Sequence, residues 1–251
     1  MSFGAVIIGD EILSGRRQDK HLPRLIGLLA ARGLELAWCR YVGDDAELLT
    51  ATFRETFASG ASVFSFGGIG ATPDDLTRQC TAAAAGVPLE RHPEALGLIM
   101  EKFGEAAYPL RVLMADFPKG SVVIPNPYNR IAGFSFRGHH FLPGFPQMAW
   151  PMVEWVLDTQ YSHLFAPGRC AERSVVVLGA VESQLIPLMN EVLARFPGLK
   201  LFSLPTAGEP RIELGVKGEP AQAAAAIAYI CDGVQRSGFR YVEVNAQASP
   251  S

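Results

Sequence analysis

The chain has 251 residues, of which 49% are hydrophobic, and a formal net charge of −3. This length allows one large or two modest domains with a substantial core, and the charge gives no support for a nucleic-acid-binding surface. The four cysteines lie far apart without a Cys-X-X-Cys pair, which excludes a finger-type zinc site and a disulfide framework and favours a cytoplasmic protein. Neither a signal peptide nor a membrane span is expected.

The first strand is expected at residues 4–9, which are apolar on both faces, as in parallel strands covered by helices. A polar loop follows at residues 9–15 and carries Asp10 and Ser14. Ligands of open α/β sheets bind outside the carboxyl ends of strands, so this loop is a candidate wall of a binding site. Leucines at helical spacing over residues 22–29 then predict a helix.

The second strand is expected at residues 34–42, followed by a turn containing Asp44 and Asp45. Asp45 suits the cap of the helix that continues through residues 48–53. Asp44 is therefore the candidate ligand in a second polar loop at a strand's carboxyl end.

The stretch 67–77 (GGIGATPDDLT) has the clearest functional pattern. It follows an apolar strand at residues 61–66 and leads into a helix expected to begin near Asp74, with Pro73 in its first turn. Glycine amides and a helix N-terminus together favour a bound phosphate. The adjacent aspartates, Asp74 and Asp75, favour a divalent cation between carboxylate and phosphate. The alternative is an ordinary strand-to-helix turn with Asp74 as a helix cap.

The remainder of this region predicts a series of short elements. We expect helices at 78–85, 94–103 and 108–116, a strand at 121–127 ending in Pro-Asn-Pro, a hairpin at 133–142, and a helix after the turn at 143–146. His139 and His140 are adjacent strand residues that point to opposite faces, so they are not expected to ligate one metal together. Trp150 and Trp155 are expected in a core or an interface.

A linker is expected at residues 161–169, and the pattern changes beyond it. Strands at 173–178, 200–204 and 211–216 and helices at 182–196 and 221–234 form a βαββα unit that can build its own core. The expected organisation is a first domain over 1–160, a small domain over 170–243 and a disordered tail over 244–251.

Five motifs together resemble the molybdopterin-binding domain superfamily, and more closely the amino-terminal family of competence/damage-inducible protein A (CinA). They are the segments 9–15, 42–45, 67–77, 124–127 with 133–134, and 142–146. The resemblance implies a three-layer α/β/α fold of the MogA/MoaB kind, followed by a small α+β, KH-like domain. The family places Asp-Thr-Asn after the first loop, whereas residues 18–21 here keep only Asp19.

The resemblance also implies a site for a nucleotide or pterin phosphate. Metal-dependent hydrolysis of a nucleotide pyrophosphate such as ADP-ribose is the leading hypothesis, with non-catalytic molybdopterin or nucleotide binding and molybdopterin adenylyl transfer as alternatives. By motif position, Asp75 and Asp44 are the catalytic candidates, and Asp10, Asp44 and Asp75 are the candidate ligands of Mg²⁺ or a similar ion. The candidate phosphate- and nucleotide-binding residues are Gly67, Gly68, Gly70, Thr72, Asp74, Ser14, Asn126, Pro143 and Gly144.

The expected partners are small molecules, and no membrane partner is expected. Nucleic acids are not expected because the small domain lacks a basic Gly-X-X-Gly loop. A homo-oligomer is expected from the resemblance and from aromatic residues such as Trp150. Full-length relatives often carry a deamidase domain, and the chain is expected to end before it, so that activity is not transferred here. The substrate, the metal and the occurrence of turnover stay open at this point.

Overall fold

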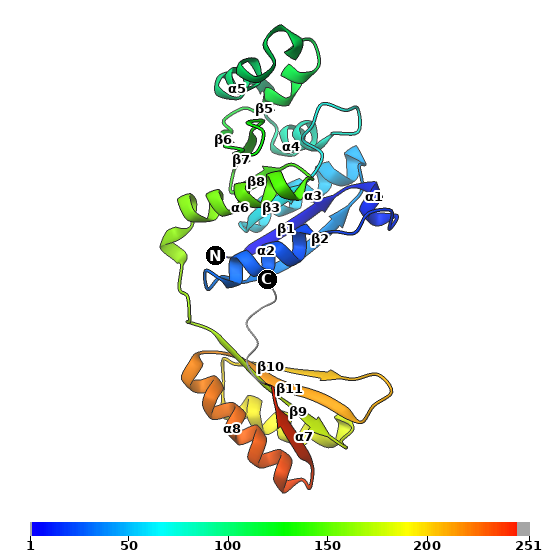
Figure 1. The fold of residues 1–251 in the computed structure, drawn as a ribbon, viewed down its shortest axis with the longest axis vertical. Coiled ribbons are helices and arrows are strands. Elements are labelled where there is room, and N and C mark those ends of the chain that lie inside the picture. The colour runs from blue at the N-terminus through cyan, green and yellow to red at the C-terminus, as the bar shows by residue number, and fades with distance from the viewer. Residues whose placement is uncertain (1, 245–251) are drawn as a thin grey trace. The chain divides into compact units, whose positions relative to one another are not determined.

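A computed structural model describes residues 2–244 (Figure 1). Its contacts divide the chain into two units, Met1–Phe165 and Ala166–Ser251. The division lies inside the linker expected at 161–169. The tail expected at 244–251 lies, apart from its first residue, outside the described residues.

The first unit is built on a mixed six-stranded sheet with the order β2-β1-β3-β8-β7-β6. Strands β2, β1, β3 and β8 are parallel neighbours, whereas β7 and β6 are antiparallel additions at one side. The strands are β1 (Phe3–Ile8), β2 (Leu36–Val42), β3 (Ser62–Phe66), β6 (Val122–Ile124), β7 (Gly133–Phe136) and β8 (His139–Leu142). The helices are α1 (Asp10–Leu13), α2 (His21–Ala30), α3 (Ala46–Ser59), α4 (Thr77–Ala85), α5 (Pro93–Phe103) and α6 (Pro146–Gln160).

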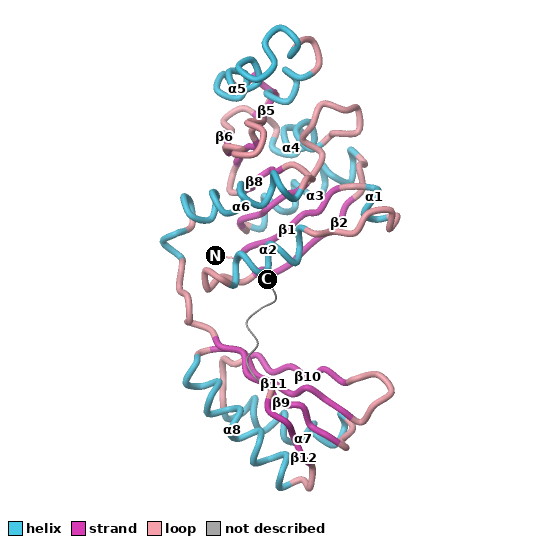
Figure 2. Tube along the Cα trace, viewed as in Figure 1, coloured by secondary structure: helices cyan, strands magenta, loops and turns pink. Residues whose placement is uncertain are grey.

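Helices cover both faces of this sheet because its central strands are apolar on both sides. Along β1, Val6 and Ile8 join the core formed with α3 and α4, whereas Ala5 and Ile7 join the core formed with α2 and α6. Figure 2 shows these helices and strands by type. The three-layer α/β/α architecture expected from the sequence is confirmed.

The parallel strands place their carboxyl ends at one edge of the sheet. The chain moves from β1 to β2 on one side and then returns to β3 on the other side of β1. The carboxyl ends of β1 and β3 therefore flank a topological switch point, where ligands of open α/β sheets bind. The loops at 9–15, 43–45 and 67–77 all leave the sheet at this edge.

Three expectations about local structure are wrong. The helix expected from near Asp74 begins at Thr77, because residues 71–76 form turns that the Asp75 side chain closes by accepting from Thr72 N. The helix expected at 108–116 shortens to the 3₁₀ turn η2 (Arg111–Ala115), because Pro109 follows an extended Tyr108, and another 3₁₀ turn, η1 (Gly104–Ala107), precedes it. The loop expected at 9–15 begins as α1.

Two short strands were not expected in the segment between α4 and β6. Strands β4 (Leu89–Arg91) and β5 (Asp116–Pro118) pair with each other in a separate two-stranded sheet. Arg91 and Asp116 join them through a two-pronged ion pair, with nitrogen–oxygen distances of 2.6 and 3.0 Å.

The second unit is a four-stranded antiparallel sheet with two helices and its own core. Its elements are β9 (Ala171–Leu178), α7 (Glu182–Arg195), β10 (Lys200–Pro205), β11 (Arg211–Gly218), α8 (Pro220–Arg236) and β12 (Arg240–Glu243). Strand β12 pairs with β9 and extends the expected βαββα unit by one strand. The small α+β domain is confirmed. Among residues 2–244, no helix is both long and apolar enough to cross a bilayer.

His139 and His140 point to opposite faces of β8, as expected, and both are buried in the first unit. His139 Nε2 lies 2.9 Å from Thr56 Oγ1, and His140 Nε2 lies 2.7 Å from the Tyr161 hydroxyl. Burial lowers the pKa of His139 to about 4 and that of His140 to about 3. Both imidazoles are therefore neutral packing groups, and neither is a catalytic candidate.

These histidines make the stability of the first unit depend on pH. Their pKa values in the folded state lie below the unfolded value of 6.5, so the unfolded chain binds more protons at acid pH. Stability is complete above about pH 6.5, and the free energy of unfolding should fall by about 1.4 kcal/mol per histidine for each pH unit down to about pH 4. Urea unfolding at pH 7, 6 and 5 measures this slope. His139→Gln should lower this slope by the contribution of about one proton. An equal slope in the variant and the parent protein would contradict the assignment.

Candidate functional site

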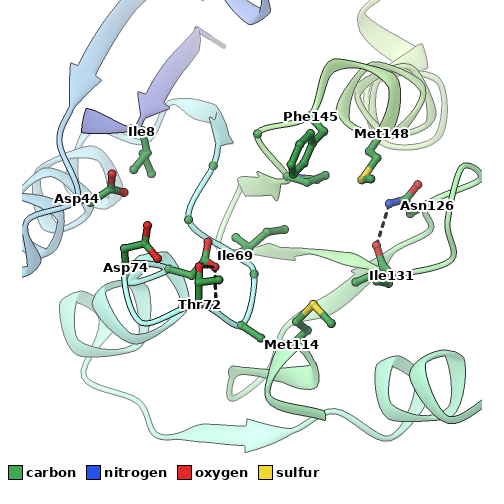
Figure 3. A pocket seen from close by; sticks show the side chains of 18 of the residues that line it. Ile8, Asp44, Ile69, Thr72, Asp74, Met114, Asn126, Ile131, Phe145 and Met148 are labelled. Atoms are coloured by element: carbon green, nitrogen blue, oxygen red, sulfur yellow. Dashed lines mark hydrogen bonds between the residues drawn. The ribbon is translucent and has the colours of Figure 1, made fainter. Parts of the chain in front are cut away.

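A pocket of about 470 Å³ lies at the switch point between β1 and β3 (Figure 3). It takes lining residues from the ends of β1 and β3, from the loop after β2 and from the turn before α6. Ten of the twelve residues expected in the site line it: Asp44, Gly67, Gly68, Gly70, Thr72, Asp74, Asp75, Asn126, Pro143 and Gly144. The other two, Asp10 and Ser14, are not among its lining residues.

The glycine loop after β3 is held from behind by Thr77, the first residue of α4. Thr77 Oγ1 donates to the carbonyl oxygen of Gly67 at 3.0 Å, and Thr77 N donates to that of Gly68 at 3.0 Å. Gly67 and Gly68 have φ angles of 103° and 68°, a region that favours glycine. A Cβ on Gly67 would lie 2.6 Å from the Ile8 carbonyl oxygen, and one on Gly68 would overlap Thr77 Oγ1. Glycine is therefore required at both positions.

Arg78 holds the next part of the same loop. Its side chain is buried, and its guanidinium donates to the Gly70 carbonyl oxygen at 2.6 Å and to the carbonyl oxygen of Leu113. Burial lowers the pKa of Arg78, while the nearby carboxylates of Asp116 and Asp75 act in the opposite direction. Arg78 thus joins the glycine loop to η2, which carries the pocket residue Met114.

These three anchored carbonyls determine where the loop's amides point. In a planar trans peptide, the carbonyl and the following N–H point in opposite directions. Anchoring the carbonyls of Gly67, Gly68 and Gly70 therefore turns the amides of Gly68, Ile69 and Ala71 away from α4, and all three residues line the pocket. Among residues 2–244 the structure records no hydrogen bond from these amides. A set of unpaired N–H groups facing one cavity is an anion-binding arrangement.

Asp75 braces this loop. Its Oδ2 accepts from Thr72 N at 2.9 Å and also from the Thr72 hydroxyl. A Cβ on Gly70 would overlap the same carboxylate oxygen, so the side chain of Asp75 lies tightly against the loop. The structure thus gives Asp75 a positioning role for Thr72 in addition to its place in the pocket lining.

Asp44 and Asp10 form a reciprocal pair. Asp10 N donates to Asp44 Oδ2 at 3.0 Å, and Asp44 N donates to Asp10 Oδ1 at 3.2 Å. Burial raises the pKa of Asp44, and the negative charges of Asp10, Glu11 and Asp74 raise it further. The carboxylate that acts on Asp44 from the glycine loop is therefore that of Asp74, which lies near Asp44 in Figure 3.

A metal centre made by Asp10, Asp44 and Asp75 does not fit this geometry. Within the described part of the chain, no three histidine, cysteine, aspartate or glutamate side chains come close enough to hold a metal ion together. Asp10 lies outside the pocket lining, and Asp75 accepts two hydrogen bonds from Thr72. Asp44 and Asp74 are the two carboxylates that remain free to face the pocket together. Such a pair suits Mg²⁺, because this ion commonly binds one or two protein carboxylates together with phosphate oxygens of the ligand.

Asn126 organises the opposite wall of the pocket. Its Nδ2 donates to Asn129 Oδ1 at 2.8 Å and to the Ile131 carbonyl oxygen at 3.0 Å, and its Oδ1 accepts from Tyr128 N at 3.0 Å. Its amide is therefore already engaged in shaping the turn after β6. Its role in this structure is to position that wall.

The comparison with known families agrees with this architecture. The family described as "Probable molybdopterin binding domain" matches residues 4–163. The chain belongs to this family. The crystal structure of the protein CinA with unknown function from Thermoplasma acidophilum is similar over 62% of this chain and 96% of that chain, with a TM-score of 0.58 and 28% identity.

Relatives of this molybdopterin-binding-domain protein include CinA-like proteins. One from Anaeromyxobacter sp. (strain K) is 39% identical over 165 residues, which are 62% of this chain and 40% of that protein. Another, from Anaeromyxobacter dehalogenans (strain 2CP-C), is 36% identical over 237 residues, which are 90% of this chain and 57% of that protein. The chain therefore spans about half the length of these curated relatives.

Sequence reasoning missed the residues that hold the glycine loop from behind. Thr77 lay in the functional stretch 67–77 without a role of its own, and Arg78 was assigned to an ordinary helix, although an arginine directly after a glycine loop is a usable signal. Arg17 was also missed, although it lines the pocket and lies 4.0 Å from Glu11. The sequence around Arg17 did not indicate that its side chain would reach the pocket.

Removing the Thr77 hydroxyl should loosen the loop of this molybdopterin-binding domain. Thr77→Val is nearly isosteric but leaves the Gly67 carbonyl without its donor, which should cost about 1–3 kcal/mol of unfolding free energy. Thr77→Ser keeps the hydroxyl and loses a methyl group, which should lower the free energy of unfolding by about 0.8 kcal/mol. Urea unfolding of both variants makes the comparison. Equal stability of the valine variant and the parent protein would show that Thr77 does not hold the loop.

Proposed function

We propose that the pocket binds the phosphate-bearing part of a nucleotide or pterin and that the protein hydrolyses a nucleotide pyrophosphate such as ADP-ribose. The reaction would add water across the phosphoanhydride and release AMP and ribose 5-phosphate. The observation that carries the proposal is the set of unpaired amides at Gly68, Ile69 and Ala71, beside the carboxylates of Asp44 and Asp74.

The amides supply the binding energy for phosphate. Backbone N–H groups that are held in place do not need to reorganise when an anion binds, which makes them effective charge stabilisers. The Thr72 hydroxyl donates to Asp75 in this structure, so Asp75 fixes where the Thr72 side chain lies at the edge of the loop. Arg17 also lines the pocket and places a positive charge there.

The acidic lining requires a counterion. Glu11, Asp44, Asp74 and Asp75 all line the pocket, so a phosphate would meet strong repulsion from these carboxylates. Asp44 and Asp74 would hold a divalent ion such as Mg²⁺, whose chemistry is to neutralise phosphate charge and to lower the pKa of bound water. Burial raises the pKa of Asp44, and the charges of Asp10, Glu11 and Asp74 raise it further; a bound cation would offset these charges.

Binding without turnover is the second candidate. The engagement of Asp75 with Thr72 favours it, because an aspartate that braces a loop need not take part in chemistry. A molybdopterin carrier, or an enzyme that transfers an adenylyl group to molybdopterin, would use the same amides. Incubating the protein with ADP-ribose, FAD, NAD and ATP in the presence of Mg²⁺, Mn²⁺ or Co²⁺ separates these functions. Metal-dependent AMP release from ADP-ribose is expected, and saturable binding of ADP-ribose without AMP release would favour the carrier.

Asp75→Asn distinguishes a catalytic aspartate from a loop brace. The asparagine Oδ1 can still accept from Thr72, so the loop and the affinity for ADP-ribose should be retained. Loss of the pocket-lining carboxylate, which can accept the proton of the attacking water, should lower turnover by about 100-fold. Calorimetry gives the affinity and AMP release gives the rate. A variant that binds ADP-ribose and hydrolyses it at the parent rate would remove Asp75 from the catalytic group.

A further inference from the structure

An apolar groove of about 450 Å³ lies on the surface of the first unit and takes no lining residue from the glycine loop. It is formed by α5, by the segment that follows β6 and by α6. Its apolar lining consists of Leu98, Pro125, Pro127, Pro151 and Trp155. The volume lies within the range of ligand-binding clefts.

Few side chains of the groove can donate a hydrogen bond. Three of the lining residues are prolines, which have no N–H group. The Trp155 side chain is 36% exposed, and within residues 2–244 its indole N–H has no recorded partner. The side-chain amide of Asn126 already donates to Asn129 and Ile131. Among the lining side chains, the available donors are therefore the Trp155 indole and the guanidinium of Arg130.

Arg130 is held in a backbone conformation that is unfavourable for its residue type. Its φ angle is 65°, in the left-handed region that favours glycine and asparagine. Its guanidinium donates to both carboxylate oxygens of Glu101 at 2.7 Å, but the two side chains are 54% and 58% exposed, and exposed ion pairs contribute little to stability. Strained non-glycine residues are concentrated at binding and catalytic sites.

Arg130 can bind a second carboxylate without releasing Glu101. A guanidinium has five N–H donors, and Glu101 accepts from two of them. Tryptophan and arginine are also the residue types that contribute most often to the energy of protein interfaces. The occupant that matches this groove is therefore apolar, offers free acceptors along its length and carries a carboxylate at one end.

We propose that this groove docks a proline-rich segment of a partner protein in the polyproline II conformation, with an acidic residue beside the prolines. Such a segment has no internal hydrogen bonds, so its carbonyl groups are free to accept from the Trp155 indole. Its proline rings pack on the apolar lining, as in other grooves that recognise polyproline II through aromatic side chains. The acidic residue pairs with Arg130. This inference does not depend on the phosphate site.

A segment docked in the groove would contact the turn that shapes one wall of the pocket at the glycine loop. Asn126 lines both the groove and that pocket, and Arg130 N donates to the Asn126 carbonyl oxygen at 2.9 Å. Helix α6 likewise contributes Met148 to the pocket and Trp155 to the groove. The same turn and the same helix therefore serve both surfaces.

Calorimetry with a peptide of eight prolines preceded by two aspartates tests the inference. Saturable binding to the parent protein is expected, and a peptide of the same length and charge with glycine and serine in place of proline should lose it. Trp155→Phe keeps an aromatic ring and removes the N–H donor, so the affinity should fall by about 2- to 10-fold, as for loss of one hydrogen bond. Trp150→Phe is the matched control, since Trp150 lies on the same helix and does not line the groove.

Arg130→Gly separates a binding role of Arg130 from a structural role. Glycine adopts the left-handed conformation readily, so Tm should not fall. The affinity for the acidic peptide should fall by about 2- to 5-fold, as for loss of one exposed ion pair, and the affinity for a peptide of prolines alone should not change. Arg137→Gly is the matched control, because Arg137 also has a positive φ angle, 48°, and does not line the groove.

Three results would overturn the inference. The first is the absence of saturable binding of both proline peptides to the parent protein up to millimolar concentration. The second is an unchanged affinity for the acidic peptide in both Trp155→Phe and Arg130→Gly. The third is a dimer, detected by analytical ultracentrifugation, that Trp155→Ala dissociates, since this would assign the groove to a second copy of the chain. None of these results depends on ADP-ribose, so the proposed function is tested separately.

Discussion

The site depends on how the backbone carbonyls of the glycine loop are held. Thr77 and Arg78 are not proposed to touch the ligand. Together they donate hydrogen bonds to the carbonyl oxygens of Gly67, Gly68 and Gly70 from the side of α4. Planar peptides then leave the amides of Gly68, Ile69 and Ala71 unpaired at the pocket. The phosphate site that we propose is thus built from main-chain atoms, and the neighbouring side chains orient them.

The carboxylates around the loop divide into two kinds. Asp75 is engaged with Thr72, and Asp10 pairs with the backbone of Asp44, so both shape loops. Asp44 and Asp74 both face the pocket, where burial raises the pKa of Asp44 and the charge of Asp74 adds to that of Asp10 and Glu11. An acidic pair beside unpaired amides accommodates a cation and an anion together, whereas either alone would leave like charges facing each other.

Much of this site could be predicted from the sequence, because strand-end loops carry recognisable residues and parallel strands end at one edge. The glycine loop was correctly placed directly after the strand that ends at Phe66, and so was the cap role of Asp45, which accepts from Leu48 N at 2.8 Å. The orientation of Asp75 could not be predicted, since it depends on a turn that delays α4 to Thr77. Strand β12 was missed because it is short and gains its stability from pairing with β9. Pairing of His21 with Gly144, far apart in the sequence, also requires the folded chain.

The most direct test of this account is the response of individual loop amides to a ligand. In ¹⁵N-labelled protein, titration with ADP-ribose and Mg²⁺ should shift the amide resonances of Gly68, Ile69 and Ala71 more than those elsewhere in the first unit, because hydrogen bonding to phosphate moves amide protons strongly downfield. Saturable binding that leaves these three resonances in place and shifts a different set would contradict the central claim that the anchored glycine loop is the phosphate site.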